Sequence, residues 1–369
     1  MDLLKQTKQL CHLYQIKPAR SRGQNFLISE NVYDKIIKAA ELNKDDVVLE
    51  VGPGLGFLTT KLAGGANGRS PVQRVIAVEL DKKLVEILKI KLAGQNIKNV
   101  EVVNEDILRI DTPLTRGVRG VGFEKRQEPP LIPPYQGGES RGFKIVANLP
   151  YNITSIFLRK FLSAEIKPEL MVLMLQKEVA ERICARPPKM SLLAVSVQFY
   201  AVPEIITHVP KENFWSEPEV DSAMIKLHIA HRVSPIAQSQ SKISAKGAAP
   251  AIASEAVGRG SASGGENRLA TPDLLVVASP DLLRSETKRD KSEMYLGVDK
   301  ERDFFRLVKF GFSSKRKMLK NNLAAGFKIS PAEAENKLKL AGFNAKIRAQ
   351  ELSVNDWLKL FGVFKENMV

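Results

Sequence analysis

The chain has 369 residues, of which 44% are apolar and 26% are charged, as in a globular protein with a sizeable core. It contains no stretch of 18 apolar residues and no long apolar run near its first residue, so we expect neither a membrane span nor a signal peptide. The net charge of +15 indicates a polyanionic partner, most often nucleic acid and less often an anionic membrane surface. A merely basic enzyme is the alternative.

The few cysteines and histidines argue against two kinds of site. Cys11 and Cys184 are too few for a disulfide framework, which favours a reducing compartment such as the cytoplasm. The histidines show no metal-ligand spacing with cysteines or carboxylates. We therefore expect no metal.

Apolar runs alternate with amphipathic stretches through the first half of the chain. Runs typical of buried strands lie at 47–51, 75–79, 100–104, 144–147 and 170–175, and a further strand is expected at 220–225. Helical patterns lie at 29–42, 57–63, 82–92, 154–162 and 177–184, and Ser29 can cap the first of them. Strands that alternate with helices predict an α/β fold with a parallel, doubly wound sheet.

Two segments break this alternation. Residues 113–142 hold 6 glycines and 5 prolines, and they interrupt what should be a short connection between the third and fourth strands. Residues 233–298 are rich in alanine, serine and glycine. Both segments are expected to be flexible insertions, because neither can bury enough apolar area to offset its ordering entropy. The sequence thus predicts a sheet domain over 1–232 and a tail domain over 299–369.

The tail is basic and has a helical pattern. From residue 300 onward, 15 Lys and Arg stand against 7 Asp and Glu. Apolar residues that suggest a small helical bundle are Phe304, Phe305, Leu307, Val308, Phe312, Leu338, Leu340, Leu352, Trp357 and Leu360. Residues 309–328 contain no acid, and a phosphate-backbone contact is favoured over a solvated face there. The candidate RNA-binding residues are Lys309, Lys315, Arg316, Lys317 and Lys320.

A glycine turn follows the first predicted strand. Gly52, Gly54 and Gly56 form G-x-G-x-G, and Phe57 fills the place of the third glycine of the dinucleotide fingerprint. The pattern favours a cofactor without phosphate that lies against bare backbone, and S-adenosylmethionine is such a cofactor. A tight strand-to-helix turn without a ligand is the alternative.

Acidic residues end the next two strands, at the rim where ligands of such sheets bind. Glu79 ends the second strand and can accept hydrogen bonds from two ribose hydroxyls. Asp106 follows the third strand and can accept one from an adenine amino group. Asp81 and Glu105 lie beside them and could fill these roles instead.

The segment Asn148-Leu-Pro-Tyr151 follows the fourth strand at the same rim. The Asn148 side-chain oxygen and the Pro150 carbonyl can bind the two hydrogens of a base amino group and localise its lone pair. Tyr151 can stack on a base that has been flipped out of its helix. These groups indicate methyl transfer to a nucleobase nitrogen that is driven by positioning. A strand-ending turn is the alternative.

Two aromatic residues, Phe214 and Trp215, precede the strand at 220–225. An aromatic ring there could form the other wall of a base pocket or could pack in the core. For Trp215 the core is the favoured interpretation.

Seven motifs occur in the order typical of one family: Gly23-Gln-Asn-Phe-Leu27, Glu50-Val-Gly-Pro-Gly54, Val78-Glu-Leu-Asp81, Glu105-Asp-Ile107, Asn148-Leu-Pro-Tyr151, Leu175-Gln-Lys-Glu178 and Val220-Asp-Ser-Ala223. The chain resembles the ribosomal RNA adenine dimethyltransferases, most of all the bacterial small-subunit group. The resemblance covers roughly 270 residues outside the two insertions and implies a Rossmann-like class I methyltransferase domain with a small C-terminal α-helical domain.

The resemblance also implies the ligands. S-adenosylmethionine would contact Asn25, Leu27, Gly52, Glu79, Asp106 and Asn148. The target would be two adjacent adenosines near the 3′ end of small-subunit RNA, each methylated twice at N6, and Phe214 would lie near the target base. The segment 215–218 departs from the proline-rich form that is common in the family. The expected partner is small-subunit rRNA or a pre-30S particle, bound by a monomer in the cytoplasm.

Two other functions remain open from the sequence. One is a relative that methylates a large-subunit adenine and confers macrolide resistance. The other is a non-catalytic RNA-binding factor of ribosome assembly, which would not need the 148–151 constellation.

Overall fold

The computed structural model describes residues 2–18, 24–64, 72–110, 143–164, 166–229 and 298–368. By their contacts, residues 1–230 and 302–369 form one compact unit and residues 231–301 another. Nearly all of the second unit, including the predicted insertion over 233–298, lies outside the described residues, as does the segment 113–142.

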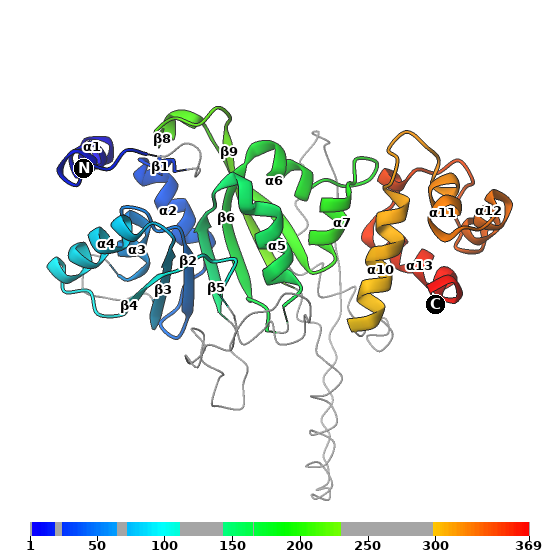
Figure 1. The fold of residues 1–369 in the computed structure, drawn as a ribbon, viewed down its shortest axis with the longest axis horizontal. Helices are drawn as coiled ribbons and strands as arrows, with labels where there is room; N and C mark the ends of the chain where they lie inside the picture. Colours follow the sequence, from blue (N-terminus) through cyan, green and yellow to red (C-terminus); the bar gives the residue numbers. More distant parts are fainter. Residues whose placement is uncertain are drawn as a thin grey trace, which may run out of the picture. The chain divides into compact units, whose positions relative to one another are not determined.

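A seven-stranded sheet forms the middle of the first unit (Figure 1). Its order is β4-β3-β2-β5-β6-β9-β7. The first five are β4 (Val100–Asn104), β3 (Arg74–Glu79), β2 (Val47–Val51), β5 (Lys144–Asn148) and β6 (Leu170–Gln176), and all of them run parallel. They confirm the five predicted strands and bring their carboxyl ends to one rim.

The last two strands, β9 (Ser222–Ile229) and β7 (Ala201–Val209), run antiparallel to their neighbours. The prediction of a wholly parallel sheet is therefore wrong at this edge. No predicted helix separates β7 from β9, so the chain returns directly and must reverse its direction. The strand β7 went unpredicted because it lies at the sheet edge, where exposed and half-buried residues follow one another without a clear alternation.

The predicted insertion between β4 and β5 lies outside the described residues and stays a prediction. The two strands are parallel, and β3 and β2 lie between them. The chain must therefore run back from one end of the sheet to the other and across two strands, which takes about a dozen residues or more.

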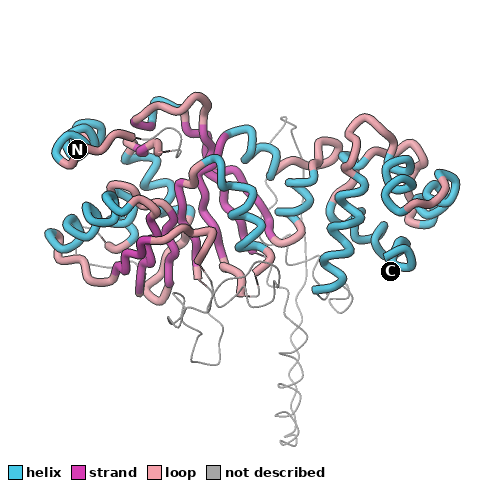
Figure 2. Tube along the Cα trace, viewed as in Figure 1, coloured by secondary structure: helices cyan, strands magenta, loops and turns pink. Residues whose placement is uncertain are grey.

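The five predicted helices form: α2 (Glu30–Ala39), α3 (Phe57–Leu62), α4 (Lys82–Gly94), α5 (Thr154–Leu162) and α6 (Lys177–Ile183). Of these, α3, α4 and α5 connect parallel strands, α2 precedes β2, and α6 follows β6. Figure 2 shows the strands in the middle of this part with helices beside them. Ser29 stands at the N-cap of α2, but its side chain makes no capping hydrogen bond, so its predicted role is wrong. The sequence missed α1 (Leu3–Leu13), α7 (Leu192–Gln198) and a two-stranded sheet of β1 (Phe26–Leu27) and β8 (Phe214–Trp215).

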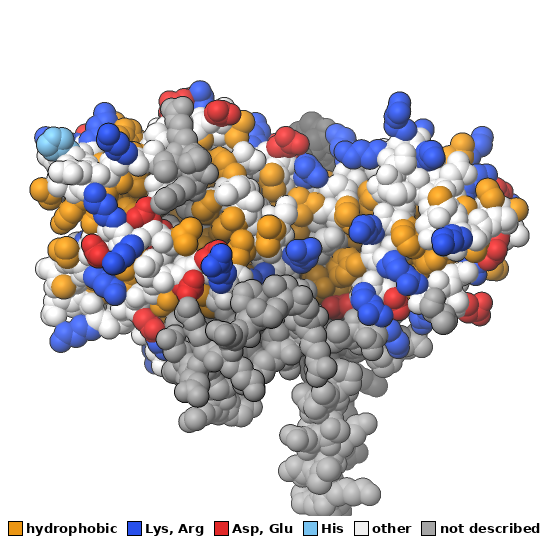
Figure 3. Space-filling model, viewed as in Figure 1, with side chains coloured by type: hydrophobic (Ala, Val, Ile, Leu, Met, Phe, Trp, Pro, Cys, Tyr) orange, Lys and Arg blue, Asp and Glu red, His pale blue; other side chains and the backbone are white. Residues whose placement is uncertain are grey.

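The tail forms the predicted helical bundle from α10 (Val298–Gly311), α11 (Leu319–Phe327), α12 (Pro331–Leu340) and α13 (Val354–Phe364). Seven of its ten predicted apolar residues are buried, whereas Phe305 and Phe312 are half-buried and Leu340 is 78% exposed. The bundle packs on the sheet part through aromatic rings: the Phe199 ring lies 4.7 Å from that of Phe304 between centroids. In the space-filling view of Figure 3, Lys and Arg side chains spread over these helices.

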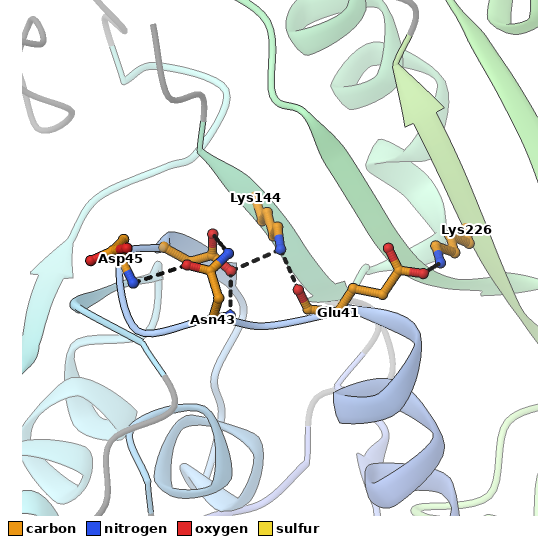
Figure 4. Close-up of polar contacts among 6 residues, drawn as sticks. Glu41, Asn43, Asp45, Lys144 and Lys226 are labelled. Atoms are coloured by element: carbon orange, nitrogen blue, oxygen red, sulfur yellow. Dashed lines mark hydrogen bonds and ion pairs between the residues drawn. The ribbon is translucent and has the colours of Figure 1, made fainter. Parts of the chain in front are cut away.

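A buried ion-pair network ties the amino ends of the strands together (Figure 4). Lys144 begins β5, and its Nζ donates to Asp46 Oδ2 at 2.8 Å and to the Glu41 carbonyl. Asn43 donates its backbone and side-chain N–H groups to the same Asp46 carboxylate. Lys226 of β9 pairs with the Glu41 carboxylate. This network lies at the opposite end of the sheet from the predicted site.

No described helix is both long enough and apolar enough to cross a bilayer.

Candidate active site at the carboxyl ends of the parallel strands

A cavity of about 140 Å³ opens at the rim where β2, β3 and β5 end. Six of the predicted site residues line it: Asn25, Leu27, Gly52, Glu79, Asn148 and Pro150. Gly54, Asp106, Tyr151 and Phe214 do not line it. The structure thus brings most of the predicted cofactor residues to one cavity, although two of them, Asn25 and Asn148, are 123 positions apart in the chain.

The glycine turn needs its glycines for two reasons. Gly52, Gly54 and Gly56 have φ values of +68°, +57° and +74°, in the left-handed region that glycine enters without steric cost. A Cβ on Gly56 would also collide with Leu88, and one on Gly54 would lie 3.2 Å from the Phe26 ring. Gly54 and Gly56 thus allow close packing of the turn, and Gly52 places its backbone at the cavity.

Glu79 links the glycine turn to the end of β3. Its carboxylate accepts hydrogen bonds from Gly54 N at 3.1 Å and from Asp81 N at 3.0 Å. Burial raises the pKa of this carboxyl, and the backbone N–H groups lower it in part. The side chain is 7% exposed and lines the cavity, where its free lone pairs can accept from a ligand.

Asp106 makes local contacts instead. Its Oδ1 accepts from Leu108 N at 2.9 Å, and Arg109 Nε lies 3.7 Å from Oδ2. The carboxylate therefore holds the turn after β4, and its contact with a cofactor adenine stays a prediction. Leu80, which sequence reasoning missed, lines the cavity while 63% exposed and offers an apolar surface to a flat ring.

The Asn148 amide has a fixed orientation. Its Nδ2 donates to the Asn25 carbonyl at 3.3 Å. Because a carbonyl only accepts hydrogen bonds, the NH₂ group must face Asn25 and the Oδ1 atom must face away from it. The Pro150 carbonyl accepts from Ile153 N at 3.2 Å and keeps its second lone pair. Both predicted acceptors therefore retain capacity for a substrate amine.

The Tyr151 ring is held by a residue from a distant motif. Its hydroxyl lies 2.8 Å from the hydroxyl of Ser222, the fully buried first residue of β9. Burial raises the pKa of Tyr151, and the hydrogen bond with Ser222 lowers it in part. The ring is half-buried, so it is anchored at its hydroxyl end and keeps some exposed surface.

Comparison with known proteins shows the family of the chain that carries this rim. The model of the family "Ribosomal RNA adenine dimethylase" matches residues 17–240. The chain belongs to this family. "Ribosomal RNA small subunit methyltransferase A" of Dehalococcoides mccartyi (strain ATCC BAA-2266 / KCTC 15142 / 195) is 34% identical over 366 residues, or 99% of this chain and 95% of the relative. The protein of the same name from Clostridioides difficile (strain 630) is 30% identical over 97% of this chain and 94% of its own length.

Two solved structures share the fold of this dimethylase. A dimethyladenosine transferase from Plasmodium falciparum aligns with a TM-score of 0.57 and 21% identity, over 93% of this chain and 98% of that one. The 23S rRNA methyltransferase ErmE aligns with a TM-score of 0.55 and 23% identity, over 92% and 100% of the two chains. They confirm a Rossmann-like methyltransferase fold.

The cofactor of this dimethylase is S-adenosylmethionine, and one buried group fits it in a way that the sequence did not reveal. Glu50 ends β2 at the cavity, is 1% exposed, and neither of its carboxyl oxygens has a hydrogen-bond partner among the described residues. The Thr59 hydroxyl faces it without hydrogen-bond geometry. A buried carboxylate without a partner is costly, and a cationic ligand relieves that cost. The ammonium and sulfonium groups of the cofactor are such cations.

Glu50→Gln should have opposite effects on stability and on cofactor binding. Burial raises the pKa of Glu50 to about 8, so the ligand-free protein loses stability, on the order of 1.4 kcal/mol per pH unit, as the pH rises from about 4.5 to 8. The neutral glutamine avoids this loss. The variant should unfold at a higher temperature than the wild type at pH 8.5, with little difference at pH 5, and should bind S-adenosylmethionine more weakly. Thermal unfolding and calorimetry measure both, with the exposed Glu86→Gln as control; equal pH profiles for Glu50→Gln and wild type would contradict the assignment.

Ser222→Ala should slow methyl transfer because it releases the Tyr151 ring. Without the 2.8 Å hydrogen bond the ring loses its anchor, and we expect kcat to fall several-fold, within the roughly 1 kcal/mol of an ordinary hydrogen bond. Tyr151→Phe removes the same bond from the other side. Single-turnover rates of both variants and of the double variant test the pairing: the double variant should be no slower than either single one, and additive losses would show that the two residues act independently.

The two aromatic residues before β9 both pack against core residues. Phe214 pairs with Leu27 in the β1–β8 sheet and is 3% exposed within the main core, so its ring has no free face toward a base. Trp215 is half-buried and stacks on Phe26 with 6.4 Å between ring centroids. The predicted role of Phe214 beside a target base stays a prediction. That role would require the Phe214 ring to leave the core.

Four of the predicted RNA-binding residues, Lys309, Lys315, Arg316 and Lys317, are exposed. Lys320 instead forms an ion pair with Glu335 at 2.6 Å and is half-buried. Within the described residues, no group of three or more His, Cys, Asp or Glu could hold a metal ion.

Proposed function

We propose that this dimethylase methylates two adjacent adenosines near the 3′ end of small-subunit ribosomal RNA, each twice at N6. The orientation of the Asn148 amide carries the proposal, because an oxygen fixed toward the rim suits an exocyclic amine. The curated relatives that match nearly the whole chain are named for the small subunit, which supports this RNA over the large-subunit target of macrolide-resistance enzymes.

Three residues of the rim would position the target adenine for methyl transfer. Asn148 Oδ1 and the Pro150 carbonyl accept the two hydrogens of the adenine amine and localise its lone pair on nitrogen. Tyr151 stacks on the flipped base, which replaces about 1–3 kcal/mol of lost stacking. Bound S-adenosylmethionine supplies a methyl group on a sulfonium, so the protein needs no strong base. After the first transfer one N–H remains, and the amine must rotate to present it again.

The partner and the setting follow from the proposed substrate. The exposed cations of the tail would bind rRNA or a pre-30S particle, and the enzyme would act as a cytoplasmic monomer, with 1–232 as the methyltransferase domain and 299–369 as the RNA-binding domain. A non-catalytic assembly factor is the competing function. It is disfavoured because a binder has no need of an oriented Asn148 beside a cofactor cavity.

Nucleoside mass spectrometry tests the proposal. Small subunits from cells that lack the gene should gain N6,N6-dimethyladenosine when incubated with the enzyme and S-adenosylmethionine, and sequencing should place it at two adjacent positions. Dimethyladenosine in large-subunit RNA alone would establish the macrolide-resistance activity, and binding without any methylated base would establish the assembly factor.

A further inference from the structure

Two backbone segments of the cofactor cavity are each held by a side chain from a neighbouring helix. The Leu27 carbonyl of β1 accepts a hydrogen bond from the Tyr33 hydroxyl of α2 at 2.9 Å. The Leu55 carbonyl of the glycine turn accepts one from Lys91 Nζ of α4 at 3.0 Å. Leu27, Tyr33 and Leu55 line the cavity, whereas Lys91 is not part of its lining. Each segment is thus fixed by one donor that takes no part in the transfer of the methyl group.

Lys91 also contacts the residue that follows the glycine turn. Its ammonium lies 4.1 Å from the centroid of the Phe57 ring, within the range of a cation–π interaction. Phe57 lines the cavity as well. The turn is therefore bound through two neighbouring backbone groups, since Glu79 accepts from Gly54 N and Lys91 donates to Leu55 O.

The Lys91 ammonium destabilises the folded protein where it lies. No described carboxylate is within ion-pair distance of it. Burial lowers the pKa of Lys91 to about 8, and the charge of Glu50 opposes this shift in part. A buried ammonium without a carboxylate partner disfavours folding, and an apolar side chain of the same length would avoid that cost. The packing of α4 alone therefore does not account for a lysine at this position.

Tyr33 has a comparable position behind β1. It is 6% exposed, and burial, together with the charges of Glu50 and Glu30, raises the pKa of its hydroxyl. The hydroxyl therefore stays protonated and donates to the Leu27 carbonyl. Since β1 has only two residues and pairs only with β8 among the described strands, this bond is a main tie between β1 and the rest of the cavity. The charge of Glu50 acts on both donors, which places Tyr33 and Lys91 around the buried carboxyl.

We propose that Tyr33 and Lys91 are positioning residues for S-adenosylmethionine, which fix the backbone of β1 and of the glycine turn in the arrangement that the cofactor binds. A carbonyl that is bound to a helix side chain cannot rotate into the cavity. A backbone segment that is already ordered also loses less conformational entropy when the ligand arrives, and binding is tighter by that difference. The inference concerns the cofactor alone, so it holds for whichever adenosines the enzyme methylates.

The test uses three variants of the full chain. Lys91→Met removes the donor and the charge while keeping the length of the side chain, Lys91→Arg keeps both, and Tyr33→Phe removes only the hydroxyl. The matched controls are Lys89→Met, an exposed lysine of the same helix, and Tyr14→Phe, whose residue lies outside the lining of the cavity. Titration calorimetry with S-adenosylmethionine gives the affinity, and thermal unfolding of the ligand-free variants gives their stability.

Lys91→Met should bind S-adenosylmethionine about tenfold more weakly and Tyr33→Phe several-fold more weakly, as expected for the loss of a charge-assisted and of an ordinary hydrogen bond. Lys91→Arg should recover most of the affinity, and both controls should match the wild type. The unfolding temperature of Lys91→Met should not fall, because the variant no longer buries an ammonium. At saturating cofactor, the single-turnover rate on small subunits should stay within about twofold of the wild type, because the two residues act on binding.

Three results would overturn the proposal. One is wild-type affinity in both Lys91→Met and Tyr33→Phe. Another is a folded Lys91→Arg variant that binds as weakly as Lys91→Met, since the restored donor would then have no effect. The third is a loss of affinity that a fall in unfolding temperature matches in every variant, which would show a role in folding only. If the wild type forms no dimethyladenosine, the proposed function fails, whereas the calorimetric comparison still decides the roles of Tyr33 and Lys91.

Discussion

Asn148→Ala should lower the rate of methyl transfer by about 10²-fold or more, which corresponds to roughly 2.7 kcal/mol of transition-state stabilisation. The variant loses the acceptor oxygen that Asn25 holds toward the rim, while the Pro150 carbonyl remains. RNA affinity should persist, because phosphate contacts elsewhere dominate it. Single-turnover methylation with saturating cofactor measures the effect on the chemical step.

Asn152→Ala is the matched control for this prediction. Asn152 is an exposed asparagine in the same short turn, so its substitution tests whether any change in the loop slows the reaction. It should keep the wild-type rate. Full activity in Asn148→Ala, or an equal loss in both variants, would remove Asn148 from the chemical step.

Asp46→Ala should destabilise the fold by about 3–5 kcal/mol, because it leaves the buried Lys144 ammonium without its carboxylate. Equilibrium unfolding in guanidinium chloride measures the loss, and the exposed neighbour Lys44→Ala is the control. Replacing the pair together, as Asp46→Ala/Lys144→Met, should recover part of the stability, since no buried charge then remains unpaired. If Asp46→Ala lowers the free energy of unfolding by less than about 1 kcal/mol, water reaches the network, and the ion pair contributes no more than an exposed one.

The parallel half of the fold could be predicted from the sequence because its strands, apart from the half-buried edge strand β4, are buried on both faces and consist largely of apolar residues. Val75 to Val78 and Leu170 to Leu175 are examples, with every residue buried. The edge strand β7 gave no such signal. Strand order also lies outside what periodicity encodes, so the position of β5 beside β2 became clear only from the sheet.

The candidate site was predictable where one short segment holds a whole function, as in the glycine turn and at 148–151. It was not predictable where function arises between segments. Glu50 appears in the sequence as the polar end of a strand, and only its 1% exposure and missing partners make it a ligand group. Ser222 likewise gains its role from Tyr151, which lies far away in the chain.

The reversed direction of β9 has a practical consequence for engineering. The residues that follow the parallel strands lie at the rim and surround the cofactor cavity. Because β9 is antiparallel to β6, the residues at the same rim are its first residue, Ser222, and the segment that precedes it, residues 210–221. The rim is thus built both from residues that follow parallel strands and from a segment that precedes an antiparallel strand. A designer who exchanges residues 210–221 between family members would replace β8, which pairs with β1 beside the cofactor cavity, so residues 25–27 would have to be exchanged together with it.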